Sequence, residues 1–244
     1  MDRPEARNAF SEELQSSLTD AFAGVGEDVR VIVLTGAGPA FSAGADIAWM
    51  RSAADNGFED NVADSRRFEG MLAAVDTCPV PVVARINGHA LGGAVGLIAC
   101  ADVALAVDGA LFGFSEVRLG IAPAMISHYA QRRIGVGNAR RYFLTGERFD
   151  AARAQRLGLV SEVAADLAAL DDLVDHVVDE LLASAPGAQR ATKALIATIA
   201  STPDPADTVD ARVELIARLR VAEEGQDGLG AFFDKRRPSW HPDA

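Results

Sequence analysis

The sequence predicts an α/β fold, in which strands alternate with helices, followed by a helical C-terminal third. Short runs of β-branched residues end in turns rich in glycine and proline, which is typical of buried strands. Apolar residues at the three- and four-residue spacing of helices separate those runs, and from Ala124 onward this helical spacing dominates. The 244 residues suffice for one full α/β domain and are few for two.

The first predicted elements follow one another closely. Asn8 to Ala23 carries an apolar residue at every fourth position, which predicts a helix. The run VRVIVL at residues 29–34 predicts a buried strand, because the turn at residues 35–39 follows it. Asp46 is the expected N-cap of a short helix. Residues 52–60 are small and polar and are expected to be mobile.

The middle of the chain repeats this alternation. A helix is expected over residues 61–75, and the run VPVVARI that follows it predicts a second strand. A glycine-rich segment at residues 88–96 opens an apolar helix that is expected to end near Cys100. Residues 102–107 predict a third strand, so strands and helices continue to alternate.

The C-terminal third is predicted to be helical. Pro186 is expected to start one helix and residues 206–220 to form another, with residues 202–205 as a hinge between them. An earlier helix is predicted from apolar residues at helical spacing: Leu170, Leu173, Val174, Val177, Val178, Leu181 and Leu182. The sequence shows neither an internal repeat nor a low-complexity segment.

The chain is acidic, with a formal net charge of −12 and a pI near 4.7. This charge argues against a nucleic acid or an anionic membrane as a partner. A polyanionic ligand would need a local basic patch, and Lys235, Arg236 and Arg237 are the candidate. A solvated helix end is the alternative interpretation of that run.

Several other signals are missing from the sequence. No apolar stretch reaches the roughly 18 residues of a membrane span, and the N-terminus lacks the apolar segment of a secretory signal. Cys78 and Cys100 lie far apart, and Cys100 is expected to be a buried free thiol. The histidines show no metal-ligand spacing, so no metal is predicted. The composition predicts a cytoplasmic protein.

Two glycine-rich turns, FSAGAD at residues 41–46 and NGHALGGA at residues 87–94, each join a strand to a helix. Small residues let a ligand approach the backbone, and the first N–H groups of a helix are unpaired donors. Two such donors aimed at one carbonyl oxygen form an oxyanion hole, worth about 3–4 kcal/mol of transition-state stabilisation per donor. Taken alone, either turn is more simply explained as a tight connection between a strand and a helix.

The sequence matches the common phosphate-binding and nucleophile motifs poorly. The segment GAGPAF at residues 36–41 lacks the last glycine of GxGxxG, and neither turn has the GK[ST] of a P-loop. GFSEV begins like a nucleophile elbow, but Val117 replaces the glycine that this motif requires. His89 has no partner residue nearby in the sequence, and a lone histidine of this kind is more often a polar group of the loop.

Four segments in order resemble the crotonase (enoyl-CoA hydratase/isomerase) superfamily: FSAGAD, INGHALGGAVGLIACADVALA, FGFSEVRLGIAP and LTGERFDAARAQRLGLV. The resemblance runs from Arg3 to the closing DKRRPSW and is greatest to bacterial 3-methylglutaconyl-CoA hydratases. It implies a ββα spiral over residues 1–190 and a helical trimerisation region over residues 191–244. The implied assembly is a homotrimer or a dimer of trimers.

The resemblance also places an active site. It assigns the oxyanion hole to the N–H groups of Ala45 and Gly93 and acid/base catalysis to Glu116. The positions that match coenzyme A contacts in the family are Ala6, Ala43, Ala45, Asp46, Ile47, Gly92, Gly93, Lys235 and Arg237. Coenzyme A would enter as part of the substrate, and no other cofactor is implied. Because relatives usually begin with a strand or hairpin ahead of Arg3, one edge of the first sheet is expected to be absent or covered differently.

Glu116 is supported by its own surroundings. Phe112, Phe114 and Val117 flank it, and partial desolvation by these side chains should raise its pKa. The resemblance places a second glutamate of some relatives at Gly96, and an aspartate of others at Ala124. A single carboxylate therefore remains for proton transfer.

The expected function is hydration of an α,β-unsaturated acyl-CoA, with 3-methylglutaconyl-CoA as the best single substrate. One alternative is a Δ3,Δ2-enoyl-CoA isomerase, in which Glu116 moves a proton between two carbons. The alternative from another class is a non-catalytic acyl-CoA-binding subunit, since Gly96 could mark lost activity. Trp49 and Met50 are equally compatible with lining an acyl pocket and with packing.

Overall fold

The computed structural model describes all 244 residues. The chain divides into two compact units. The first comprises residues 1–26, 33–78 and 82–175, and the second comprises residues 27–32, 79–81 and 176–244. This division differs from the predicted boundary at residue 190, and the predicted trimerisation role stays a prediction. None of the helices combines the length and the apolar character that crossing a membrane requires.

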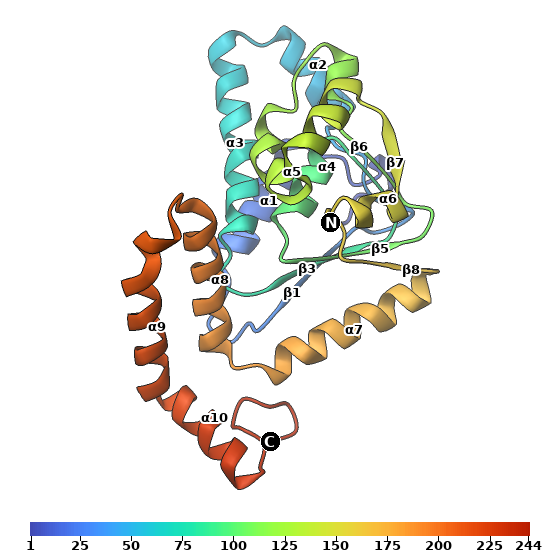
Figure 1. Cartoon of the computed structure of the whole chain (residues 1–244). Helices are drawn as coiled ribbons and strands as arrows, with labels where there is room; N and C mark the ends of the chain where they lie inside the picture. Colours follow the sequence, from blue (N-terminus) through green and yellow to red (C-terminus); the bar gives the residue numbers. More distant parts are fainter. The chain divides into compact units, whose positions relative to one another are not determined.

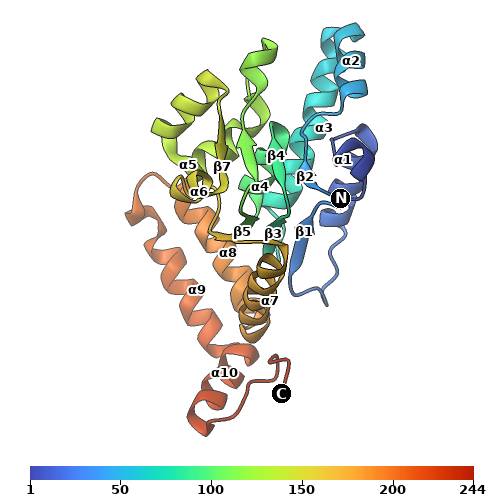
Figure 2. The same ribbon diagram turned by 90° about the vertical axis from the view of Figure 1, so that its right-hand side faces the viewer.

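The strands form two four-stranded sheets. One has the order β1-β3-β5-β8, formed by Ile32–Thr35, Val82–Ile86, Val103–Val107 and Glu162–Ala164. The other has the order β2-β4-β6-β7, formed by Ala40–Ser42, His89–Leu91, Leu111–Gly113 and Arg148–Asp150. Figure 2 shows β1, β3 and β5 next to β2, β4 and β7.

From β1 to β6, successive strands alternate between the two sheets, and a helical segment follows every second strand. The helices of the first unit are η1 (Pro4–Ala6), α1 (Glu12–Ala23), α2 (Ile47–Asp55), α3 (Phe58–Asp76), α4 (Gly93–Cys100), η2 (Glu116–Leu119), α5 (Ala124–Thr145) and α6 (Ala151–Arg156). Helix α7 (Leu167–Ala183) leads into the second unit. The chain thus runs β1-β2-α2-α3, β3-β4-α4 and β5-β6-η2-α5. This repeat is the predicted ββα spiral, and the α/β fold class is confirmed.

Helix α4 is the centre of the first unit. Its residues 94–100 are all buried, and it packs against α3 and α5 (Figure 1). The predicted free thiol of Cys100 is confirmed, and burial raises its pKa. Asp102 follows this helix, and its carboxylate accepts the Val82 N–H at 2.7 Å, which ties the turn to the start of β3.

The start of the first helix differs from the prediction. Helix α1 begins at Glu12 because the Ser11 hydroxyl accepts the N–H of Leu14 and caps it. Asn8 instead has a φ of 54° and is fully buried, and its amide donates to the carbonyls of Ala37 and Ala40 at 2.9 Å each. A residue predicted as helical therefore anchors the loop between β1 and β2.

Strand β1 lies at one edge of its sheet. Residues before α1 cover part of that edge: the Met1 ammonium donates to the Thr35 carbonyl, and the Ala37 N–H donates to the Met1 carbonyl, both at 2.8 Å. The edge expected from the sequence is therefore partly closed by the start of the chain.

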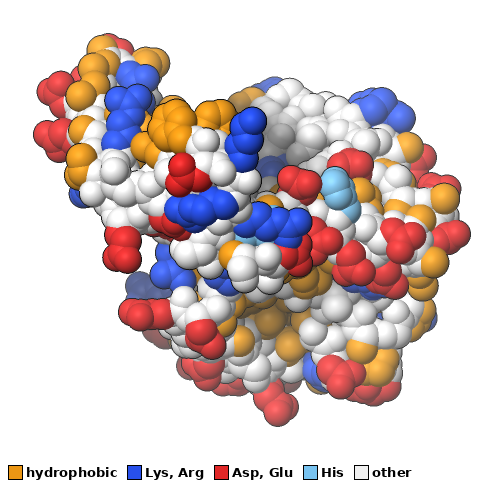
Figure 3. Space-filling view, turned by 90° about the horizontal axis from the view of Figure 1, so that it is seen from below, with side chains coloured by type: hydrophobic (Ala, Val, Ile, Leu, Met, Phe, Trp, Pro, Cys, Tyr) orange, Lys and Arg blue, Asp and Glu red, His pale blue; other side chains and the backbone are white.

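The second unit contains α8 (Pro186–Ser201), η3 (Pro205–Thr208), α9 (Val209–Val221) and α10 (Glu223–Asp234). Pro186 starts α8 as predicted, and the Glu224 carboxylate accepts the N–H groups of Gly187 and Ala188 at its N-terminus. Large apolar side chains on these helices are exposed: Ile196, Ile199, Val209, Val213, Ile216, Val221, Leu229, Phe232 and Phe233. Figure 3 shows one face of the molecule, where acidic side chains are widely spread and Lys and Arg gather beside apolar ones.

Candidate active site

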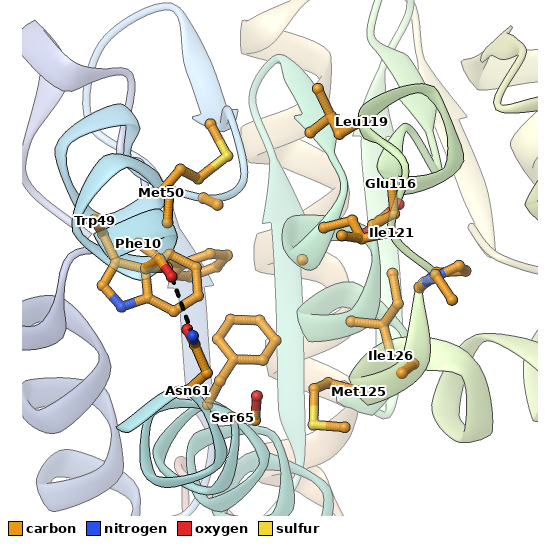
Figure 4. A pocket seen from close by; sticks show the side chains of 18 residues that line it. Phe10, Trp49, Met50, Asn61, Ser65, Glu116, Leu119, Ile121, Met125 and Ile126 are labelled. Atoms are coloured by element: carbon orange, nitrogen blue, oxygen red, sulfur yellow. Dashed lines mark hydrogen bonds between the residues drawn. The ribbon is translucent and has the colours of Figure 1, made fainter. Parts of the chain in front are cut away.

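A cavity of about 710 Å³ lies within the first unit (Figure 4). Side chains of α2, α3 and η2, the start of α4 and residues 121–126 line it. Trp49 and Met50 are among them. The sequence alone left open whether these two residues line a pocket or only pack, and the structure places them in the pocket lining. Glu116 is the one ionisable side chain in the lining, which contains no Lys, Arg or His. The cavity is therefore an apolar chamber with a single carboxyl group.

The two glycine-rich turns meet at this cavity. Gly44 has a φ of 89°, and a Cβ added there would lie 2.5 Å from the Leu91 carbonyl oxygen and 3.7 Å from the Gly93 nitrogen. Only glycine allows this close approach of the two backbones. The contact places residues far apart in the sequence, Ala45 and Gly93, in the lining of one cavity.

Hydrogen bonds on both sides of Ala45 fix its orientation. The Phe10 N–H donates to the Gly44 carbonyl at 2.8 Å, and the Asp46 N–H donates to the Phe10 carbonyl at 3.3 Å. Because peptide groups in an extended chain point alternately to opposite sides, the Ala45 N–H points away from Phe10. It has no hydrogen-bond acceptor, and neither has the Gly93 N–H in the first turn of α4.

These two N–H groups have the properties of an oxyanion hole. Both are backbone donors without a partner, and both belong to residues that line the cavity. A carbonyl oxygen held by such a pair would gain about 3–4 kcal/mol per donor as negative charge develops on it. The arrangement suits reactions that pass through an enolate.

Glu116 lies beside the second turn. It is the first residue of η2, and Phe114 and Ser115 connect it to the end of β6. A Cβ added at Gly92 would lie 3.3 Å from Glu116 Oε1, so the carboxyl group is next to the residue that precedes Gly93. Its Oε2 is buried without a partner, and burial raises the pKa of Glu116 as the sequence predicted.

Gly96, where the resemblance placed a second glutamate of some relatives, lies against another side chain. A Cβ added at Gly96 would lie 2.2 Å from Cγ2 and 2.6 Å from Cβ of Ile126, which belongs to α5. Figure 4 shows Ile126 on the same side of the cavity as Glu116 and Ile121. A side chain at residue 96 would therefore require Ile126 to move, and Glu116 is the single carboxyl group of the chamber.

Asp46, another predicted site residue near the cavity, has a structural role. The Asp46 carboxylate caps α2 by accepting the Ala48 N–H at 2.8 Å and pairs with Arg3 at 3.1 Å. Burial alone would raise the pKa of Asp46, but these hydrogen bonds outweigh it and lower the pKa. The Asp46 carboxylate is thus already engaged.

The remaining predicted coenzyme A contacts differ in accessibility. The side chain of Ile47 is 66% exposed, and Ala6 and Ala43 are half-buried. The Ala43 N–H donates to the Arg7 carbonyl at 2.9 Å, so only its carbonyl remains for a ligand.

The basic pair that was predicted to reach the phosphates lies in the second unit. Lys235 ends α10 with a φ of 55°, and Arg237 pairs with Asp243. Arg236, between them, pairs with Asp227 at 2.6 Å. The role of Lys235 and Arg237 at the phosphates stays a prediction.

Sequence reasoning missed many of the lining residues, among them Asn61, Ser65 and Ile126. Asn61 and Ser65 are four residues apart in the polar N-terminal half of α3, and this spacing is the signal that could have found them. The Asn61 amide donates to the Ala53 carbonyl at 3.1 Å and ties α2 to α3. His89, in contrast, is a loop group as expected, because its Nδ1 accepts the Leu111 N–H at 3.1 Å.

Comparison with known proteins agrees with this geometry. Residues 1–243 match the enoyl-CoA hydratase/isomerase family. The chain belongs to this family. A family relative from Thermus thermophilus, a putative enoyl-CoA hydratase, is 35% identical over 239 residues, covering 96% of this chain and 93% of that protein.

Solved structures are similar over nearly the whole chain as well. An enoyl-CoA hydratase from Shewanella pealeana superposes with a TM-score of 0.92 at 40% identity, covering 98% of this chain and 89% of the other. Pseudomonas aeruginosa AtuE superposes with a TM-score of 0.94 at 38% identity, covering 98% and 93%. The family fold therefore extends over nearly the whole chain.

Proposed function

We propose that the protein hydrates the double bond of a 2-enoyl-CoA. One observation carries this proposal: two unpaired backbone donors, of Ala45 and Gly93, and the Glu116 carboxyl group share one apolar cavity. The donors would bind the thioester oxygen and draw electron density from C3. In the ionised form, Glu116 is the one side chain in the lining that can take a proton from water.

The hydration reaction balances with Glu116 as the single acid/base group. The water oxygen forms a bond to C3 while a water proton passes to Glu116, and the thioester becomes an enolate held by Ala45 and Gly93. The protonated Glu116 then gives its proton to C2, and the carbonyl re-forms. The carboxylate is regenerated, so Glu116 acts first as base and then as acid.

The coenzyme A moiety would lie along the backbone of Ala6, Ala43, Ala45 and Ile47, with Lys235 or Arg237 at its phosphates. We further propose that the exposed apolar side chains of α8–α10 are covered by other copies of the chain in a trimer. Both proposals rest on the family resemblance together with the exposure described above.

The individual substrate is a separate question. The resemblance of the sequence to bacterial 3-methylglutaconyl-CoA hydratases makes 3-methylglutaconyl-CoA our specific candidate. Its terminal carboxylate would have no cationic partner in the cavity, because no Lys, Arg or His side chain lines it. An uncharged 2-enoyl-CoA meets no such mismatch, so both classes belong in the assay.

A second function, isomerisation of a 3-enoyl-CoA to the 2-enoyl isomer, is favoured by one observation. Ile126 fills the place of a second carboxylate, and moving one proton from C4 to C2 requires only Glu116 and the two donors. We rank hydration first because the resemblance to a hydratase subgroup includes the glycine at position 96.

Labelled water distinguishes these functions. We expect the enzyme to abolish the conjugated absorbance of 3-methylglutaconyl-CoA or crotonyl-CoA, with 18O from the solvent appearing at C3 of the product. Conversion of a 3-enoyl-CoA without any incorporation of 18O would identify an isomerase instead. Binding without turnover of any enoyl-CoA would identify a non-catalytic subunit.

The pH dependence of catalysis is expected to report the environment of Glu116. Burial raises its pKa, so the carboxylate required as the base is lost at a higher pH than for an exposed glutamate. As the pH falls, kcat/KM for hydration should therefore begin to decrease above the ordinary titration range of glutamate. A profile that stays flat down to that ordinary range would contradict the assignment of Glu116 as a buried base.

A further inference from the structure

Arg3 lies outside the lining of the catalytic cavity, but its guanidinium group holds two segments that carry the site. Its Nη1 donates to the Ala9 carbonyl at 2.7 Å, and Nη1 and Nη2 both donate to Asp46 Oδ2 at 3.1 Å. No proposed step of hydration uses this side chain. Arg3 nevertheless joins the N-terminal segment to the residue that caps α2.

The two partners of Arg3 flank the backbone bridge that orients Ala45. In this bridge, the N–H and the carbonyl of Phe10 bond the residues on either side of Ala45. Ala9 directly precedes Phe10, and Asp46 directly follows Ala45. One guanidinium group therefore clamps both segments of the bridge.

The clamp acts at the longer of the two backbone bonds. The bond from the Asp46 N–H to the Phe10 carbonyl measures 3.3 Å, whereas the bond from the Phe10 N–H to the Gly44 carbonyl measures 2.8 Å. Backbone N–H groups bond oxygen most often at about 2.9–3.0 Å, so the first bond is the weaker one. Hydrogen bonds from a guanidinium to a carboxylate are stronger than those between neutral groups. Arg3 thus reinforces the end of the bridge that follows Ala45.

The backbone of Arg3 is itself fixed, so the side chain extends from a firm anchor. The Arg3 N–H donates to Asn8 Oδ1 at 2.9 Å, and the Arg3 carbonyl accepts the N–H groups of Ala6 and Asn8 at 3.0 and 2.9 Å. Pro4 restricts φ at the start of η1. The buried amide of Asn8 is bonded in turn to the segment that leads into β2.

Asp46 can remain the N-cap of α2 without Arg3. Its Oδ1 accepts the Ala48 N–H at 2.8 Å, and the guanidinium group bonds only Oδ2. Removing the guanidinium group should therefore leave α2 capped and loosen mainly the connection between Ala9 and Asp46. An oxyanion-hole donor is effective only when it is aimed at the oxygen, so a small rotation of the Ala45 peptide should weaken its effect.

We propose that Arg3 is a positioning residue for the oxyanion hole, which holds the Ala45 N–H in the direction that the thioester oxygen requires. This inference rests on the proposed enoyl-CoA chemistry and adds to it a residue outside the cavity. Arg3 acts through Ala9 and Asp46, and the proton transfers by Glu116 do not involve it.

Arg3→Met tests this role, because it keeps the apolar stem and removes every donor. We expect it to lower kcat with crotonyl-CoA by about 10-fold, which is less than the effect of losing a whole donor. Binding of the saturated thioester butyryl-CoA should change little. Arg3→Lys keeps the charge but lacks the rigid fork of the guanidinium, so kcat should fall by about threefold. This second variant keeps the test valid if Arg3→Met does not fold.

The carbonyl stretch of bound butyryl-CoA, labelled with 13C at the carbonyl carbon, is a readout that a loss of stability alone would not change. Hydrogen bonds to the thioester oxygen weaken the C=O bond, so binding to the native protein should move the stretch to lower wavenumber. We expect a smaller displacement in both Arg3 variants, at a temperature at which their circular dichroism is native. A saturated thioester has no double bond to hydrate, so this measurement does not depend on turnover.

Arg67 provides the matched control. Its side chain is 31% exposed, as is that of Arg3, and it pairs with Asp64 at 3.0 Å and with Glu12 at 3.1 Å. Arg67 does not line the cavity and does not contact the bridge at Ala45. Arg67→Met should therefore leave both kcat and the carbonyl stretch of the bound thioester unchanged.

Native values of kcat and of the carbonyl stretch in the Arg3 variants would overturn the role of Arg3. Equal losses in Arg3→Met and Arg67→Met would also overturn it, because any half-buried ion pair would then have the same effect. If binding to the native protein leaves the stretch unchanged, the oxyanion hole and the proposed function fail, and this inference fails with them. The two kinds of failure are therefore distinguishable.

Discussion

Replacing Glu116 with glutamine is expected to lower kcat by at least about 10²-fold, because the amide can neither accept nor release the proton. The substitution keeps the size of the side chain, so the binding of a CoA thioester should change little. A parallel fall in kcat and kcat/KM would identify an interaction made only in the transition state. Steady-state kinetics with a 2-enoyl-CoA and titration with a saturated acyl-CoA measure the two effects separately.

A matched glutamate controls for the loss of charge alone. Glu162 is exposed in β8 and does not line the cavity, so Glu162→Gln removes the same charge without touching the site. Its turnover should equal that of the native enzyme. Near-normal turnover of Glu116→Gln would mean that another group transfers the proton, and the proposed mechanism would be wrong.

The second large effect is expected from Gly44→Ala. The added Cβ would lie 2.5 Å from the Leu91 carbonyl oxygen, at a φ of 89°, so the two turns must move apart. That movement displaces the N–H groups of Ala45 and Gly93 relative to each other. Loss of one oxyanion-hole donor typically lowers kcat by about 10²- to 10³-fold, and we expect a decrease of that size.

The variant Gly109→Ala is the control that distinguishes displacement of the oxyanion hole from backbone strain. Gly109 has a φ of 84°, and a Cβ added there would meet nothing within 4 Å. Gly109→Ala therefore carries a similar conformational cost without a clash. We expect it to lower the melting temperature with kcat unchanged. Equal losses of kcat in the two variants would show that strain, and not the oxyanion hole, determines the result.

The sequence was a good guide to helices and long strands and a poor guide to short ones. Apolar spacing located α3 and α7, because a long amphipathic face repeats its signal over several turns. The strands β6 and β7 have only three residues each, which is too few for any periodicity. Their pairing depends on neighbours in the sheet, and that information is not local.

The candidate site was predicted from the resemblance of four segments to one family, and not from any single residue. Two signals in the residues agree with it: the glycine-rich turns, where Gly44 and Gly92 have positive φ, and the apolar neighbours of Glu116. Ile126 could not be predicted, since its importance comes from the contact between Gly96 of α4 and Ile126 of α5. Such contacts between distant segments leave no pattern in a single sequence.

The contact between Gly96 and Ile126 also limits how this protein could evolve. Gly96→Glu alone would force a carboxylate into space occupied by the isoleucine, and overpacking of this kind costs about 1–3 kcal/mol or more. Truncating Ile126 alone would leave a cavity costing roughly 2–5 kcal/mol. The effects of two substitutions on stability do not add when the residues are in contact. We therefore expect the two changes together to cost less stability than the sum of the separate costs. A second carboxylate at position 96 would therefore require a change at Ile126 as well.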